Sequence, residues 1–126
     1  MKGEALTRLF DHSAFAASHA DLLDLLEAQA DNTQIAEALG QLQEKLRAQF
    51  AREEQAMQEA AFIALDAHKK DHDNALERLT AQARHWQDTQ DPAALLDYLA
   101  GPFTDWFVRH VNSRDFITAQ RLSLGV

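Results

Sequence analysis

Apolar side chains recur along this chain at intervals of three and four residues, which is the spacing of one face of an α-helix. The pattern appears in four segments, at about residues 11–30, 31–57, 64–86 and 92–121. Each apolar stripe marks the face with which a helix would pack into a shared core. The hydrophobic pattern therefore predicts four amphipathic helices.

Short polar or proline-marked connections separate these helices. The polar triplet at 31–33 offers capping side chains to the second helix. Asp91 followed by Pro92 marks the start of the fourth helix, because proline at the first helical position loses no needed donor. The Gly101-Pro102 pair interrupts this helix, and we expect a kink or a break into two helices there. Since short connections favour antiparallel neighbours, we predict an all-α, up-down-up-down four-helix bundle.

Composition agrees with this fold and narrows the function. The 126 residues suit one domain with one core, so we assign residues 1–126 to a single domain. A net charge of −8 with no basic cluster argues against nucleic acid as a partner. The longest wholly apolar stretch, residues 60–65, is far shorter than the ~20 residues of a membrane span. With no export signal visible, we expect a soluble, cytoplasmic protein.

Polar residues also fall on the predicted core faces. The chain has no cysteine, so a metal site would have to use imidazole, carboxylate or amide ligands. A single inward histidine is more often a hydrogen-bonded core residue than a ligand. Six inward polar groups would otherwise need a large buried hydrogen-bond network, whereas metal cations compensate buried imidazoles and carboxylates directly. The six residues are His19, Gln49, Glu53, His68, His72 and His110.

The spacing of these residues suits metal ligation. His68 and His72 are four residues apart, which places both rings on one helix face as a bidentate clamp. The two polar residues of the second helix have the same spacing. Asp115 follows His110 by five positions, a turn of about 140° around an α-helix, so we expect it to approach from the flank and bridge two metals. No glutamate has a histidine three residues later, which excludes the ferritin-like ligand pattern.

Taken in order, four motifs on four successive helices resemble the bacterial hemerythrin family. The runs are Gln-Phe-Ala-Arg-Glu at 49–53, His-Lys-Lys-Asp-His at 68–72 and Trp-Phe-Val-Arg-His at 106–110, with Asp115 further on and His19 in the first helix. In that family the motifs read H, H-x-x-x-E, H-x-x-x-H and H-x-x-x-x-D. The resemblance covers most of the chain, with one departure: the H-x-x-x-E motif opens here with glutamine.

The resemblance implies a hemerythrin-like domain with a centre of two iron ions joined by an oxo or hydroxo bridge. Manganese and zinc are alternative metals. The second iron is implied to be the one that binds dioxygen. By the same resemblance the first iron would be held by His68, His72 and His110, the second by His19, and both by the bridging Glu53 and Asp115.

The glutamine falls at the second, reactive iron. An amide oxygen is a weak neutral ligand, so we expect Gln49 to coordinate feebly, to hold a water by a hydrogen bond from outside the ligands, or to point away. His12 lies two turns before His19, and we place it near the bundle end rather than among the ligands. Aromatic residues near the ligand positions would wall the metal pocket or simply pack in the core: Phe15, Phe50, Trp106 and Phe107.

The implied partner is dioxygen or another small diatomic ligand. Because the reactive iron lacks one imidazole, we expect bound ligand to be lost faster and favour an oxygen or redox sensor over a carrier. Such a module would be a binding domain, not an enzyme, and would act in signalling with a fused or separate output domain. The alternatives are a di-iron enzyme that reduces peroxide or nitric oxide, an oxygen store or carrier, and a structural bundle that is metal-free or holds zinc.

Overall fold

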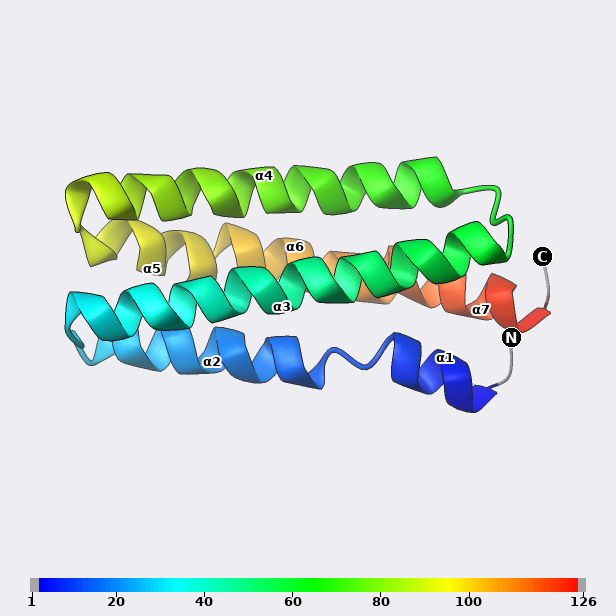
Figure 1. Ribbon diagram of the computed structural model, residues 1–126, viewed down its shortest axis with the longest axis horizontal. Helices are drawn as coiled ribbons and strands as arrows, with labels where there is room; N and C mark the ends of the chain where they lie inside the picture. The colour runs from blue at the N-terminus through cyan, green and yellow to red at the C-terminus, as the bar shows by residue number, and fades with distance from the viewer. Residues whose placement is uncertain (1–2, 125–126) are drawn as a thin grey trace.

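The protein, described here by a computed structural model over residues 3–124, is a bundle of four antiparallel rods of helix (Figure 1). A short helix precedes the second helix in the first rod, and the fourth rod is built from several pieces. The elements are α1 Gly3–Leu9, α2 Ser13–Glu27, α3 Asn32–Glu59, α4 Leu65–Thr89, α5 Pro92–Ala100, α6 Pro102–His110, the π-helical turn η1 Val111–Asp115, and α7 Phe116–Leu124.

Consecutive rods run in opposite directions, which confirms the predicted up-down-up-down bundle. Helix α3 packs between α2 and α4. The fourth rod, which consists of α5, α6, η1 and α7, closes the bundle through contacts of α5 with α2 and α4. At one end of the bundle α1 lies against α7. The hydrophobic pattern does not predict α1, and it extends the first main helix beyond both of its ends, to 11–30 instead of Ser13–Glu27.

Aspartates stand near the start of several helices. The carboxylate of Asp11 accepts a hydrogen bond from the backbone N–H of Ser13 (2.9 Å), and α2 starts at Ser13, two residues later than predicted, with His12 at its N-cap position. Asp31 and Asp91 cap α3 and α5 as expected, the latter with Pro92 at the first helical position. His12 therefore lies at the joint between α1 and α2.

The predicted interruption at Gly101 and Pro102 is a break between α5 and α6. Proline has no backbone N–H and Gly101 has a non-helical backbone (φ −106°, ψ −96°), so the helical hydrogen-bond ladder stops there. The carbonyl of Leu99 accepts from the Thr104 hydroxyl (2.7 Å) and from Nε2 of His19 (2.9 Å). The break thus provides an acceptor that faces a histidine of α2.

Two apolar clusters fill the bundle, and a polar layer lies between them. In α3, Phe50 belongs to the larger cluster and Met57 to the smaller one, while the fully buried Glu53 lies between these two turns. No helix between residues 3 and 124 has the length and apolar character needed to cross a membrane. The smaller cluster, which closes the end near α1, consists of Leu6, Met57, Phe62 and Leu122.

Candidate metal centre

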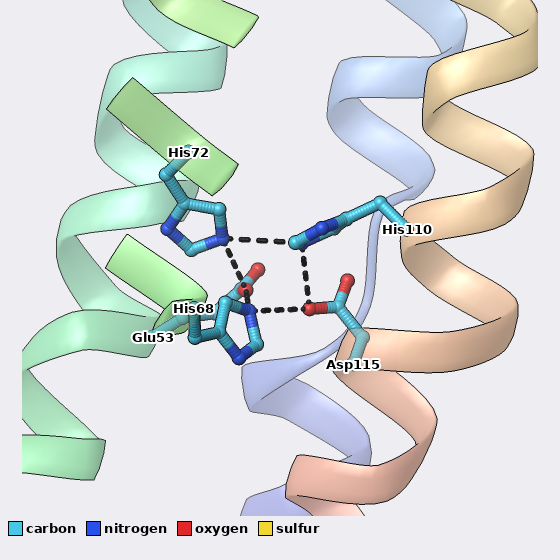
Figure 2. A group of neighbouring side chains, drawn as sticks. All are labelled: Glu53, His68, His72, His110 and Asp115. Atoms are coloured by element: carbon cyan, nitrogen blue, oxygen red, sulfur yellow. Dashed lines mark hydrogen bonds and ion pairs between the residues drawn. The ribbon is translucent and has the colours of Figure 1, made fainter. Parts of the chain in front are cut away.

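Five buried side chains from three of the rods converge on the polar layer (Figure 2). Each offers one donor atom, and all five atoms lie within 4.8 Å of one another. Oδ1 of Asp115 is 2.9 Å from Nε2 of His68 and 3.0 Å from Nε2 of His110. None of the five residues is more than 3% exposed. They are Glu53 from α3, His68 and His72 from α4, His110 from α6 and Asp115 from η1.

The protonation of two histidines shows why a cation fits here. Nδ1 of His72 lies 2.8 Å from a carboxylate oxygen of Glu54, and Nδ1 of His110 bonds to the carboxylate of Asp71. Because ionised carboxylates only accept, each Nδ1 carries the ring proton, and a neutral ring then has a lone pair on Nε2. The two Nε2 atoms are 3.1 Å apart. Two lone pairs at this distance repel unless a proton or a metal ion lies between them.

Buried polar atoms without a hydrogen-bond partner also indicate that a cation fits here. Among the described residues, Oε1 of Glu53, Nε2 of His68 and both carboxylate oxygens of Asp115 are buried without a hydrogen-bond partner. Neighbouring donor atoms in the cluster are 2.9 to 3.5 Å apart. Ligand atoms at right angles, about 2.1 Å from one metal ion, lie about 3 Å apart. Three imidazole nitrogens and two carboxylate oxygens therefore fit five positions around one ion, a donor set that suits iron.

Each histidine of the cluster is held by a hydrogen bond on the side away from the centre. His72 and His110 use the carboxylates named above, and Nδ1 of His68 lies 2.8 Å from the hydroxyl of Thr118. Asp71 is itself fixed by the indole N–H of Trp106 (3.3 Å). The two carboxylates select the tautomer of His72 and His110, and all three partners orient their rings so that every Nε2 points inwards.

The π-helical turn η1 explains how Asp115 reaches the centre. In an α-helix a step of five residues would swing this carboxylate about 140° away from His110, which was the expectation from the sequence. The π-turn has i→i+5 hydrogen bonds, so five residues make roughly one turn and bring Asp115 back beside His110. The expected approach from the flank is therefore wrong, although the residue itself is among the converging five.

The structure places His12, not His19, beside the cluster. Nε2 of His12 is 3.0 Å from Oδ2 of Asp115 and 3.5 Å from Oε2 of Glu53. His19 lies two turns further along α2, where its Nε2 donates to the Leu99 carbonyl exposed by the helix break. The assignment of His19 as a ligand is therefore corrected: its inward position is explained by a hydrogen bond in the core. The prediction that His12 lies near the bundle end, away from the ligands, is also wrong, because its ring contacts two residues of the cluster.

Gln49 is buried beside the cluster and faces it with its amide nitrogen. Nε2 donates to Oε2 of Glu53 (2.6 Å) and to the backbone carbonyl of Leu9 (2.7 Å). The amide oxygen accepts from the guanidinium of Arg52. Gln49 thus lies outside the converging donors and donates a hydrogen bond directly to a residue of the cluster, a contact that the sequence did not predict.

The predicted aromatic residues lie around the cluster, at different distances. Phe50 stacks on the ring of His72 with centroids 3.8 Å apart, and Trp106 stacks on His110 at 4.7 Å. Phe107 meets His12 edge to face at 5.6 Å. Phe15 packs on Phe107 at 4.8 Å, one layer further from the donor atoms. The ring faces exclude water from one side of the centre.

The charges of the cluster are strongly linked. Burial alone would raise the pKa of Glu53, but the imidazoles of His12, His68 and His72 that surround its carboxylate outweigh burial and lower the pKa to about 2. The pKa of Asp115 falls well below its usual range for the same reason. Burial alone would lower the pKa of His12 and of His68, yet the two carboxylates raise both to about 9. Protons on these histidines supply the positive charge that the carboxylates require.

The chain matches the model of a known protein family. The model described as Hemerythrin HHE cation binding domain matches residues 11–122, nearly the whole chain. The chain belongs to the hemerythrin family. A Bacteriohemerythrin from Aquifex aeolicus (strain VF5) is 33% identical to this hemerythrin domain over 73 residues, which are 58% of this chain and 56% of the relative. The match thus spans little more than half of that relative's length. No solved structure gives a significant match.

Several residues of the hemerythrin centre were not found from the sequence. His12 follows the unpredicted α1, and no periodic pattern reaches across that joint. Glu54, Asp71 and Thr118 support histidines from neighbouring helices. Asp71 and Glu54 stand next to His72 and Glu53 in the sequence, and the hydrophobic pattern assigns no role to either. Only the pairing of helices shows which ring each of them contacts.

Proposed function

We propose that this hemerythrin domain holds two iron ions, binds dioxygen or another small diatomic molecule through them, and serves as an oxygen or redox sensor. The observation that carries the proposal is the convergence of five buried donor atoms within 4.8 Å, some of them without any hydrogen-bond partner. Family membership supports it, because the matching model describes a cation-binding domain.

The carboxylate oxygens divide the centre into two cation positions. Oε1 of Glu53 and Oδ1 of Asp115 face the three-histidine side, where His68 lies 3.5 Å and 2.9 Å from them. Oε2 and Oδ2 face His12. In the proposed assignment, Glu53 and Asp115 would each offer one oxygen to either ion, and His12 would take the place of His19 as a ligand of the second one. The first ion would be held by His68, His72 and His110.

The iron ions would supply open coordination and electrons for reversible binding of a diatomic ligand. The chain's own part is to fix the ligand atoms and to keep water away. Glu54, Asp71 and Thr118 hold the three imidazoles in one orientation, and the two carboxylates also fix the tautomer of the rings that they contact. Phe50 and Trp106 cover the rings of His72 and His110, and a dry pocket slows the entry of protons that promote irreversible oxidation.

Gln49 favours a sensor over a carrier. It occupies the motif position at which the family resemblance expects an imidazole, and its amide nitrogen faces the carboxylate that would bridge the ions. A second ion with fewer protein ligands would be more exposed to solvent and would release its diatomic ligand sooner. A short-lived bound state suits signalling through an output domain better than transport does.

The test is anaerobic loading with excess ferrous iron, metal quantification, and an absorption spectrum before and after air. We expect iron in the centre and charge-transfer bands that appear in air and vanish on reduction. A variant with His72→Ala should lose both, while His85→Ala, on the exposed surface of the same helix, should keep both. An iron-loaded protein that stays colourless in air would overturn the proposal, and steady turnover of peroxide or nitric oxide far above that of free iron would replace it with an enzymatic function.

A further inference from the structure

We infer that Gln49 is not a metal ligand but a hydrogen-bond donor locked onto Glu53, and that this makes the two cation positions bind with very different affinities. The inference rests on the proposed function, since it concerns the second position of the same centre. It adds a state that the proposed function does not require: a protein with one cation bound over a wide range of metal concentration.

The orientation of the Gln49 amide follows from the chemistry of its partners. The Leu9 carbonyl can only accept a hydrogen bond and the Arg52 guanidinium can only donate one. Nε2 must therefore face Leu9, at 2.7 Å, and the amide oxygen must face Arg52. A flipped amide would set oxygen against oxygen on one side and N–H against N–H on the other. The nitrogen has two hydrogens, and the second is used on Oε2 of Glu53 at 2.6 Å.

This arrangement leaves no lone pair of Gln49 for a cation. The amide nitrogen has none to offer, and the oxygen is turned outwards to an exposed arginine. To coordinate, the side chain would have to give up three hydrogen bonds while it is 2% exposed, and a buried amide without partners is unfavourable because water cannot replace the lost hydrogen bonds. Coordination by Gln49 is therefore opposed by α1, which supplies the Leu9 carbonyl, as well as by Arg52.

The donor count of the two positions is consequently unequal. The first position has three imidazoles and one oxygen from each carboxylate, all buried. Among residues 3–124, the second has His12 and the remaining oxygens of Glu53 and Asp115, and one of these oxygens already accepts from Gln49. Binding a second cation must displace that hydrogen bond. The first cation should bind tightly and the second weakly.

Titration of the metal-free protein with Co²⁺, followed by calorimetry and by the visible absorption of the bound ion, tests this directly. We expect two steps, the second at least about 30-fold weaker, because changes around a metal site typically alter affinity about 10–100-fold. Gln49→His should tighten the second step at least about 10-fold and leave the first within about 3-fold. Two steps of equal affinity in the natural protein would overturn the inference, whereas absence of the first step would overturn the proposed function instead.

Gln49→Leu tests whether Gln49 donates a hydrogen bond to Glu53 or binds the second cation. If the amide is a donor, its removal frees Oε2 of Glu53, and the second step stays the same or becomes tighter. If Gln49 coordinates, the second step weakens at least about 10-fold, and the inference is wrong. Retention of the first step in the same titration shows that the variant is folded around its centre.

Arg52→Met tests the lock, with Arg47→Met as the matched control, because both residues are exposed arginines of α3. Loss of Arg52 should tighten the second step selectively, since the amide oxygen is no longer held outwards. A simple charge effect would tighten both steps together, and the Arg47 variant measures its size. Equal behaviour of the two arginine variants would refute the lock.

Discussion

Nε2 of His12 lies 3.0 Å from Oδ2 of Asp115, so the joint between α1 and α2 contacts a residue near the other end of the chain. His19, which the periodic pattern selects, instead serves the backbone of α5. The two histidines of the first rod therefore have separable roles, one at the metal centre and one in the core.

These roles predict opposite effects of two substitutions. His12→Ala should lower metal affinity at least about 10-fold, since the second position loses its imidazole. His19→Ala should leave metal binding unchanged and lower the free energy of unfolding by about 1–2 kcal/mol, because the Leu99 carbonyl loses one of its two donors and the core loses a ring. Chelator competition and denaturant unfolding measure the two effects. Loss of metal in the His19 variant would restore the original ligand assignment.

Asp71 should matter for the metal although it is not among the donors. Its carboxylate accepts from Nδ1 of His110, which fixes the tautomer and the orientation of the ring. We predict that Asp71→Asn weakens metal binding about 10- to 100-fold, measured by chelator competition. The control is Asp73→Asn on the same helix, whose carboxylate pairs with Lys69 at the surface. Equal affinities for the two variants would mean that the His110 contact does not tune the site.

Thr118 supports His68 in the same way through a hydroxyl. Thr118→Val keeps the shape of the side chain but leaves Nδ1 of a ring that is 1% exposed without its partner. We expect metal affinity to fall about 10-fold and the free energy of unfolding by about 1–3 kcal/mol. Thr118→Ser, which retains the hydroxyl, should stay within about 3-fold of the natural affinity. A serine variant as weak as the valine variant would point to packing as the cause.

The pH dependence of the metal-free protein follows from its shifted pKa values. Glu53 and Asp115 have lowered pKa values in the fold, so the stability they contribute is present above their ordinary values of 4.5 and 3.8 and is lost as the pH falls further. His12 and His68 have pKa values raised from 6.5 to about 9, so their contribution is present below 6.5 and is lost as the pH rises through 9. We predict a maximum of thermal stability between about pH 5 and 6.5.

Thermal unfolding of the metal-free protein across this range provides the measurement. In His12→Gln the decline on the alkaline side should become shallower, because one of the two raised histidines is gone. An alkaline decline of unchanged depth would show that His12 does not carry the linkage.

Much of the fold could be read from the sequence because its signals are local. The stripe through Leu39, Leu42 and Leu46 and the Asp91-Pro92 start each depend on neighbouring residues, and both lie where expected. The converging residues of α3 and α4 were also found, since a spacing of four keeps side chains on one helix face.

The remaining features depend on distant contacts. The π-turn that aligns Asp115 with His110 has no marker in local composition, and α1 is stabilised by contacts of Leu6 with residues from the far end of the chain. The choice between His12 and His19 depends on which layer of the bundle each reaches. That layer depends on where α2 begins, just after Asp11, and on the break at Gly101. Hydrophobic periodicity alone predicts neither the start of α2 nor the layer that each histidine reaches.

The cluster of Leu6, Met57, Phe62 and Leu122 is assembled from α1, the end of α3, the turn between α3 and α4, and α7. It closes the end of the bundle at which α1 lies against α7. Because Leu6 and Leu122 are far apart in the sequence, this closure depends on the packing of α1 against α7. A change that separates these two helices would open the polar layer to solvent at this end of the bundle.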